Sequence, residues 1–189
     1  MSSKFKVSFT LDEEDARYFR NLYRKAKKNA AGQDPQRIVK EAMALVERVR
    51  ASKKTPRFVT EAIAVLEDLT RLIEDQSYDA PKNVVNQVLA ALAYFSNPED
   101  LIPDNIPGLG FLDDAIMVKF VEDEFKHELA GYRKFCRFRD GAEQRPWTRV
   151  SRERLPKRLR DYRKQMRAEI SRRLAADQEK KRFRGYLGW

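Results

Sequence analysis

Four aspartates are the residues of this chain whose type and spacing come nearest to a reactive centre. They gather on one proline-containing loop and on the helix expected after it, and they are Asp100, Asp104, Asp113 and Asp114. Carboxylates that converge in this way can hold Mg²⁺ or another hard cation, because such ions prefer oxygen ligands. A metal held there can position a phosphate group or activate water. One hypothesis is therefore a magnesium-dependent enzyme.

The same aspartates also have a structural interpretation, which we favour. Asp113 and Asp114 fall in the first turn of the expected helix, where the helix dipole stabilises negative charge. Asp100 and Asp104 lie in a loop whose backbone amides need acceptors, and aspartate commonly supplies them in turns. We expect these carboxylates to hold the loop together, with no metal or other cofactor.

Other catalytic arrangements are largely excluded by composition. The chain has one cysteine and one histidine, which excludes a disulfide framework, a Cys-rich zinc site and most His-based centres. We expect His127 to be exposed or salt-bridged and Cys136 to be a small buried apolar residue, since neither has a catalytic partner nearby in sequence. A phosphate-binding glycine pattern and a serine-nucleophile motif are absent as well. The sequence assigns no catalytic residue and favours a protein that is not an enzyme.

Charge is divided unevenly along the chain. The 189 residues contain 39 Lys+Arg and 29 Asp+Glu, a net charge of +10. Residues 1–57 carry a net +8, residues 58–128 a net −11 and residues 129–189 a net +13. Residues 1–144 have 23 Lys+Arg against 24 Asp+Glu, so the whole excess lies in the last 45 residues. The acidic centre can neutralise part of this charge within the fold, but the C-terminal excess indicates an anionic partner.

The C-terminal segment has the composition of a nucleic-acid-binding helix. Arginine outnumbers lysine there, which suits bidentate contacts with phosphate, and aromatic rings can stack on unpaired bases. We predict that it binds RNA or a ribonucleoprotein such as the ribosome through Arg158, Arg160, Arg163, Lys164, Arg167, Arg172, Arg173 and Trp147. Two other partners stay open: a basic amphipathic helix can lie on an anionic membrane surface, and the segment can bind a protein as an adaptor.

Hydrophobic spacing predicts an all-α protein, a compact bundle of about five helices followed by a basic C-terminal helix. The expected helix starts are Asp12, Asp34-Pro35, Thr55-Pro56, Asp79 before Pro81, and Phe111 or Leu112. The fourth helix is expected to reach Phe95 and the fifth Arg139, with a break over residues 141–147. Pro156 is expected in the first turn of the last helix, because an interior proline loses a hydrogen bond.

Two further expectations concern organisation and location. We divide the chain into a helical domain, residues 1–140, and a basic helix and tail, residues 141–189, that docks on it; residues 4–11 alternate as a short strand does. The most apolar stretch, Val84 to Phe95, is far shorter than the roughly 20 residues a spanning helix needs. The first residues lack the apolar region of a secretory signal. These features predict a cytoplasmic protein without a transmembrane segment.

The proline- and aspartate-containing segment also resembles a known family. Leu92 to Val118 read LAYFSNPEDLIPDNIPGLGFLDDAIMV, which is similar to the S-P-x-D-L-I-P-D-x-I-P-x-x-G-x-L-D-D pattern of the YkvA-like bacterial family, a domain of unknown function. The matching residues are Ser96, Pro98, Asp100, Leu101, Ile102, Pro103, Asp104, Ile106, Pro107, Gly110, Leu112, Asp113 and Asp114. The resemblance covers about residues 84–121 and implies a small helical fold, with no settled activity, substrate or cofactor.

Overall fold

The computed structural model describes residues 10–52, 55–96, 101–104, 106, 109–144 and 149–186. Within them the chain forms six α-helices and one short 3-10 helix, which confirms the predicted all-α class. The helices are α1 (Glu13–Asn29), α2 (Pro35–Ala51), α3 (Arg57–Glu74), α4 (Lys82–Leu92), α5 (Leu112–Glu143) and α6 (Arg149–Tyr186), and the 3-10 helix is η1 (Ala93–Ser96). The strand predicted over residues 4–11 lies almost entirely outside the described residues.

The first two helices begin where local sequence signals place them. Asp12 is the N-cap of α1: its Oδ1 accepts hydrogen bonds from the amides of Glu14 and Asp15, and Asp15 accepts one from the Asp12 amide. Asp34 caps α2 by accepting from the amide of Gln36 at 3.1 Å, with proline at the first helical position. Side-chain capping of this kind depends only on neighbouring residues, so it can be read from the sequence.

The next two helices begin slightly later than the expected starts at Thr55-Pro56 and at Asp79 before Pro81. Pro56 and Pro81 occupy the N-cap positions of α3 and α4, and neither helix has a side-chain cap. Both prolines have ψ near 145°, outside the helical region, so each helix starts one residue later than an N1 proline requires. Asp79 instead takes a left-handed turn conformation with φ of 49°. The fourth helix also ends at Leu92, where the chain tightens into η1 rather than continuing to residue 95.

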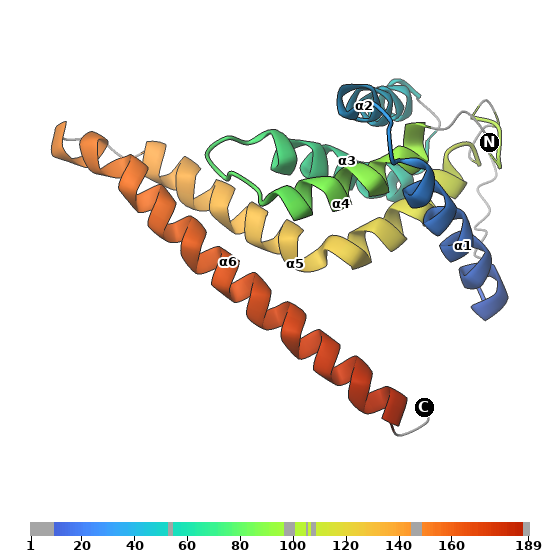
Figure 1. Ribbon diagram of the computed structural model, residues 1–189. Coiled ribbons are helices and arrows are strands. Elements are labelled where there is room, and N and C mark those ends of the chain that lie inside the picture. Colours follow the sequence, from blue (N-terminus) through green and yellow to red (C-terminus); the bar gives the residue numbers. More distant parts are fainter. Residues whose placement is uncertain are drawn as a thin grey trace, which may run out of the picture.

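The core lies between α5 and the group formed by α2, α3 and α4. Leu66 and Leu69 of α3, Leu92 of α4 and Phe135 of α5 are fully buried in one hydrophobic cluster. α1 covers one end of it, where Phe19 stacks against Phe120 of α5 with ring centroids 6.3 Å apart. α5 packs on α3 and α6 and, at one end, on α1 (Figure 1).

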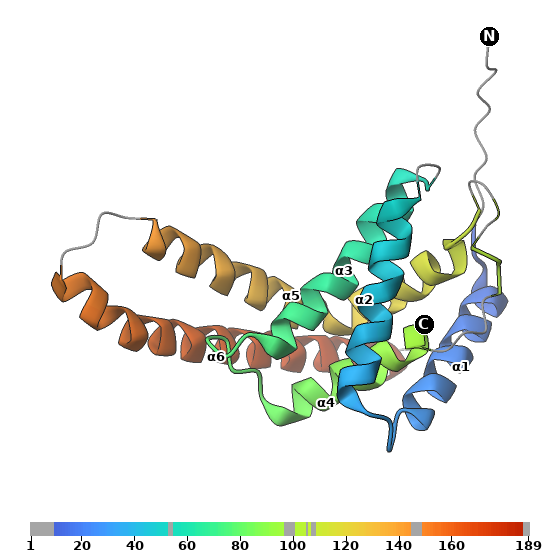
Figure 2. The ribbon, with the colours of Figure 1, turned by 90° about the horizontal axis from the view of Figure 1, so that it is seen from above.

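The longest helix, α6, runs antiparallel to α5 and packs along it (Figure 1 and Figure 2). α3 and α4 lie on the side of α5 that faces away from α6 (Figure 1). The last part of α6 diverges from the body, and residues 178–182 are all exposed. In the described part of α6, contact with the body extends to Asp177, which pairs with Lys126 and His127 of α5.

The limits of α5 and α6 differ from prediction. α5 continues past Arg139 to Glu143, through the first part of the expected break. Pro156 lies inside α6, seven residues after its start at Arg149, where the prediction placed it in the first turn. An interior proline leaves one carbonyl of the preceding turn without its amide partner. Because Pro156 and its neighbours Glu153 and Arg154 are exposed, water can satisfy that carbonyl.

Candidate functional site

The inner face of α6 docks on α5 through its apolar stripe. Met166 and Ile170 are buried, and Tyr162 stacks on Phe138 of α5 with centroids 4.0 Å apart. Leu174, which the same stripe includes, is 40 % exposed because α6 is by then leaving the body. The stripe therefore packs as helical spacing predicts, up to about residue 170.

Two arginines of the predicted nucleic-acid site lie on this inner face and bind the body. Arg167 donates to Glu128 Oε2 at 2.7 Å, and its guanidinium lies 4.3 Å from the ring centroid of Tyr78. Tyr78 donates its hydroxyl to the same Glu128 oxygen at 3.3 Å, and burial followed by the Glu128 charge raises the pKa of the phenol. Arg163 pairs with Asp79 at 3.2 Å. Both arginines hold α6 in place.

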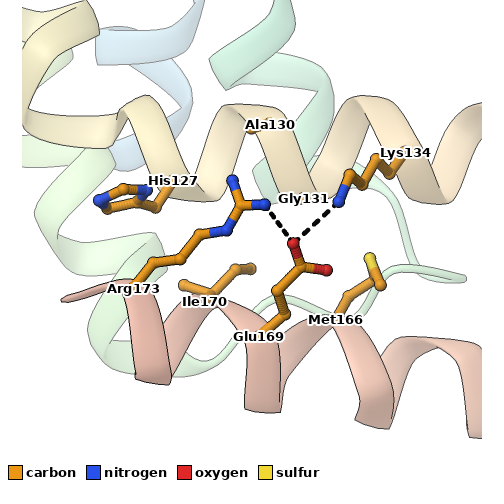
Figure 3. Close-up of a pocket in the computed structure, with 8 residues that line it drawn as sticks. All are labelled: His127, Ala130, Gly131, Lys134, Met166, Glu169, Ile170 and Arg173. Atoms are coloured by element: carbon orange, nitrogen blue, oxygen red, sulfur yellow. Dashed lines mark hydrogen bonds and ion pairs between the residues drawn. The ribbon is translucent and has the colours of Figure 1, made fainter. Parts of the chain in front are cut away.

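A small pocket between α5 and α6 is closed off by further ion pairs (Figure 3). Glu169 of α6 accepts from Lys134 of α5 at 2.8 Å and also pairs with Arg173, a third member of the predicted set. His127 lines the pocket, and its Nε2 lies 2.8 Å from Asp177 Oδ2 of α6. This is the salt-bridge geometry, one of the two environments predicted for His127. The charged groups around this pocket are directed at one another and serve the helix contact.

Four other cations of α6 are exposed on the side of the helix opposite its buried residues. We define the outer face of α6 as Lys157, Arg160, Lys164 and Arg172, which are exposed and recur at helical spacing opposite the buried stripe. Asp161 is the acidic residue among them. None of the four cations forms an ion pair with any residue in the part of the chain that the structure describes.

The predicted nucleic-acid site is therefore split. Arg160, Lys164 and Arg172 belong to the outer face, whereas Arg163, Arg167 and Arg173 are ion-paired. Arg158 is exposed, with its guanidinium 5.7 Å from the ring centroid of Phe138. Trp147 lies outside the described residues.

In the aspartate loop, Asp113 binds backbone amides of the loop. Asp113 is 4 % exposed, and its Oδ2 accepts from the amides of Leu101 at 2.8 Å and Ile102 at 3.1 Å. Its Oδ1 is buried and has no hydrogen-bond partner in the described part of the chain. Asp113 and Asp114 do lie in the first turn of α5, as predicted. The first turn of the helix thus fastens the loop that precedes it.

Of the other two aspartates, one is described by the structure and one is not. Asp104 lies 3.6 Å from Arg48 Nε of α2, which ties the loop to a neighbouring helix. Asp100 falls outside the described residues. Among the residues that the structure describes, no group of three or more His, Cys, Asp or Glu side chains is placed to hold a metal ion.

Cys136 is half-buried on α5, and desolvation raises the pKa of its thiol, although hydrogen bonding with Tyr132 and the charge of Arg139 oppose this. A thiol of raised pKa is a poor nucleophile at neutral pH, because the thiolate is the reactive form. This agrees with the predicted role of a small packing residue.

One polar centre was not anticipated from the sequence. Asp75, directly after α3, accepts from the amides of Ser77 and Tyr78, the hydroxyl of Tyr132 and Arg139 Nη1, the last at 2.5 Å. Burial opposes its ionisation, but these hydrogen bonds and the arginine charge lower its pKa overall. Aspartate commonly accepts from the amides two and three residues later in a turn, so this part of the arrangement has a local sequence signal. The partners on α5, Tyr132 and Arg139, can be found only from the tertiary structure.

Comparison with known proteins identifies the aspartate loop and its flanking helices. Residues 87–120 match the model of a family described as "Protein of unknown function (DUF1232)". A 60-residue stretch, 30 % of this chain, is 42 % identical to the "Uncharacterized membrane protein YkvA" of Bacillus subtilis (strain 168), and the match spans 57 % of that relative's length. The predicted resemblance to the YkvA-like family is thereby confirmed over the central segment of the chain. No solved structure matches. Among the described helices, none is both long and apolar enough to cross a bilayer.

Proposed function

We propose that the protein is a non-catalytic binding protein of the cytoplasm that holds RNA or a ribonucleoprotein on the outer face of α6. The observation that carries this proposal is the division of the cations of α6 between two faces. Arg163 and Arg167 are neutralised by the acidic body, whereas the four outer-face cations are exposed and form no ion pair with the residues that the structure describes. Ion pairs with the body thus account for the positive charges on the inner face of α6. The cations of the outer face are available to an external partner.

The outer face has dimensions suited to a phosphate backbone. From Lys157 to Arg172 an α-helix rises about 22 Å, which is long enough to contact several successive phosphates. Each cation that neutralises a phosphate releases a condensed counterion, and this release supplies the affinity. Because α6 is fastened to α5 along its inner face, the cations are presented on a rigid element and lose little backbone freedom on binding.

Charge reversal of the outer face tests the proposal. We expect Arg160→Glu, Lys164→Glu and Arg172→Glu together to weaken binding of single-stranded RNA by at least about a hundredfold at low salt. The slope of log affinity against log salt should become shallower by about 2, since each single-strand phosphate contact contributes about 0.7. The measurement is a fluorescence-anisotropy titration at four or more salt concentrations.

A matched control is available on two other helices. Arg37→Glu, Lys40→Glu and Lys82→Glu change the net charge equally at exposed positions of α2 and α4. If this control weakens RNA binding as much as the outer-face variant, only the overall charge matters and the proposed site is wrong. Absence of binding by the wild type at low salt contradicts the proposal outright.

A membrane surface is the main competing partner of the outer face. The Bacillus relative is named a membrane protein, and exposed cations on a helix attract anionic headgroups. Sedimentation with anionic vesicles, with and without the outer-face reversal, separates this partner from RNA. If the protein is instead an adaptor for a protein partner, we expect the outer face to bind neither RNA nor vesicles.

The magnesium-dependent enzyme has the weaker support, because Asp113 uses one oxygen on two backbone amides. It predicts that Mg²⁺ or Mn²⁺ raises the melting temperature and that Asp104→Asn removes the rise. No shift with either ion leaves the aspartates with their structural role.

A further inference from the structure

The first helix, α1, also divides its cations between two faces. Its inner face packs on the hydrophobic core through Phe19 and Tyr23, and Lys27 beside them pairs with Glu124 of α5 at 2.6 Å. The opposite side of the helix is exposed and carries cations three or four residues apart, which places them on one face. We define the outer face of α1 as Arg17, Arg20, Arg24 and Lys28.

The fold does not neutralise the outer face of α1. None of its four cations forms an ion pair with any residue among those that the structure describes. From residue 17 to residue 29 the sequence contains six Lys+Arg and no Asp or Glu. The acidic residues of α1 are confined to its first turn, where Asp15 accepts from the N-cap amide. The positive charge of this face is therefore available to an anionic partner, as it is on the outer face of α6.

An exposed aromatic ring adjoins these cations. Tyr18 is 51 % exposed, and its ring lies nearly perpendicular to that of Phe19, with centroids 5.7 Å apart. Asn21 and Lys25, three and seven residues further on, are exposed on the same side of the helix. Proteins that bind single-stranded nucleic acid combine cations that follow the backbone with aromatic rings that stack on the bases. The side chains of α1 supply both.

The position of α1 suits a strand that also contacts α6. In both views the C-terminal end of α6 lies on the side of the molecule that carries α1 (Figure 1 and Figure 2). The last cations of α6 whose side chains are described, Lys180, Lys181 and Arg182, are exposed there. A strand that follows α6 toward its C-terminal end is therefore led toward α1.

We infer that α1 is a second RNA-contacting element and that the ligand is single-stranded RNA. The outer face of α1 binds phosphates, and the ring of Tyr18 stacks on an unpaired base. The inference rests on the proposed binding of RNA by α6, and it adds a second surface and the strandedness of the ligand. A duplex offers the same phosphates, but its bases are already stacked on one another.

Neutralisation of the outer face of α1 tests the phosphate contacts. We expect Arg17→Gln, Arg24→Gln and Lys28→Gln together to weaken binding of single-stranded RNA by at least about tenfold at low salt, and to make the slope of log affinity against log salt shallower by about 2. The matched control is Lys40→Gln, Lys82→Gln and Arg137→Gln, which removes the same charge at exposed positions of three other helices. If the α1 variant melts earlier than the wild type, Arg20→Gln/Arg24→Gln replaces it, with an expected change in slope of about 1.4.

Replacement of Tyr18 tests the stacking separately from the charge. Tyr18→Ala should weaken binding of single-stranded RNA about tenfold without changing the salt slope, because it removes a stacked ring and no phosphate contact. Tyr18→Phe, which keeps the ring, should bind as the wild type does, and Tyr18→Ala should leave binding of duplex RNA unchanged. Phe58→Ala is the matched control, since Phe58 is an aromatic residue with the same 51 % exposure on α3.

The outcomes separate this inference from the proposed function. Loss of binding on charge reversal of the outer face of α6, with the α1 variants at the wild-type level, retains the proposed function and overturns the role of α1. Loss in the α1 variants, with the α6 variant unaffected, retains α1 and overturns the proposed site on α6. Equal weakening by the α1 variant and its control overturns the inference, because only the total charge then matters. If the α1 variant loses binding to anionic vesicles but not to RNA, α1 contacts lipid and the inference is wrong.

Discussion

Two buried carboxylates on α5 stabilise the fold by different means. Asp113, 4 % exposed, accepts from two backbone amides that lie 11 and 12 residues earlier in the chain. Glu128, 9 % exposed, binds a guanidinium 39 residues later and a phenol 50 residues earlier. One carboxylate thus organises the loop that leads into its own helix, and the other fastens a separate helix to the body.

The difference predicts how strongly the loop and the attachment of α6 respond to removal of these carboxylates. Neutral amide dipoles balance Asp113, and its carboxylate is almost fully buried. A full positive charge balances Glu128, and that charge is partly solvated, since the side chain of Arg167 is 21 % exposed. The loop should therefore depend on its carboxylate more strongly than the attachment of α6 depends on Glu128.

Removal of Asp113 should have the largest effect. We expect Asp113→Ala to lower the free energy of unfolding by about 3 kcal/mol, because two amides lose a charged acceptor in a partly buried site. Asp113→Asn, which keeps an acceptor oxygen, should lose about half as much. Urea unfolding followed by circular dichroism measures both. A loss for Asp113→Ala below about 0.5 kcal/mol, the level of an ordinary surface substitution, contradicts the role given to this carboxylate.

Removal of Glu128 should cost less, about 2 kcal/mol. Glu128→Ala leaves the Arg167 guanidinium near the core without its partner, but water reaches part of that group and reduces the cost. A double-mutant cycle with Arg167→Ala isolates the pair, with an expected coupling of about 1 kcal/mol. The cycle for Arg163 and Asp79 is the matched control and should give less than about 0.5 kcal/mol, because the side chain of Asp79 is 68 % exposed.

Two glycines sharpen the comparison further. A Cβ on Gly131 would lie 2.6 Å from Ile170 Cδ1, the flexible tip of a side chain of α6, whereas Gly110 faces backbone. Gly131→Ala should therefore cost about 1 kcal/mol in the wild type, where the contact outweighs the better helix propensity of alanine. In the Ile170→Val background, which lacks Cδ1 but keeps Cγ1 at 3.1 Å, the same substitution should cost clearly less. An equal cost in the two backgrounds contradicts the contact, and Gly110→Ala should have no such rescue.

Local chemistry explains which parts of the fold could be predicted. The start of α2 at Asp34-Pro35 needs only an N-cap side chain and a proline, so the sequence suffices. The proline- and aspartate-containing pattern located the loop, but closure of the chain decides which carboxylate binds which amide, and the binding of the Leu101 and Ile102 amides by Asp113 was not predicted. Pro156 was misplaced because its exposure, which lets water replace the lost hydrogen bond, depends on how α6 docks.

The distribution of cations on α6 also could be predicted only in part from the sequence. Helical spacing separated its apolar stripe from its cations, and Met166 and Ile170 are buried accordingly. It did not separate Arg167, which binds the body, from Lys164, which faces outward, because the carboxylate partner comes from α5. Which cations remain for an external partner is decided by tertiary contacts between residues far apart in the sequence.

The attachment of α6 beyond Ile170 should be pH-dependent, and this is the smallest effect we expect. Lys126, at 2.5 Å, and then His127, at 2.8 Å, lower the pKa of Asp177 from its ordinary value of 3.8 to about 2. Because the folded-state pKa is lowered, the stabilisation is present above pH 3.8 and is lost as the pH falls through about 2. Amide hydrogen exchange of residues 171–182 should therefore accelerate between pH 4 and pH 2, relative to residues 157–166. Asp177→Asn should remove this difference, since an amide does not titrate. Equal acceleration in the variant and the wild type would show that the end of α6 is held by something other than this carboxylate.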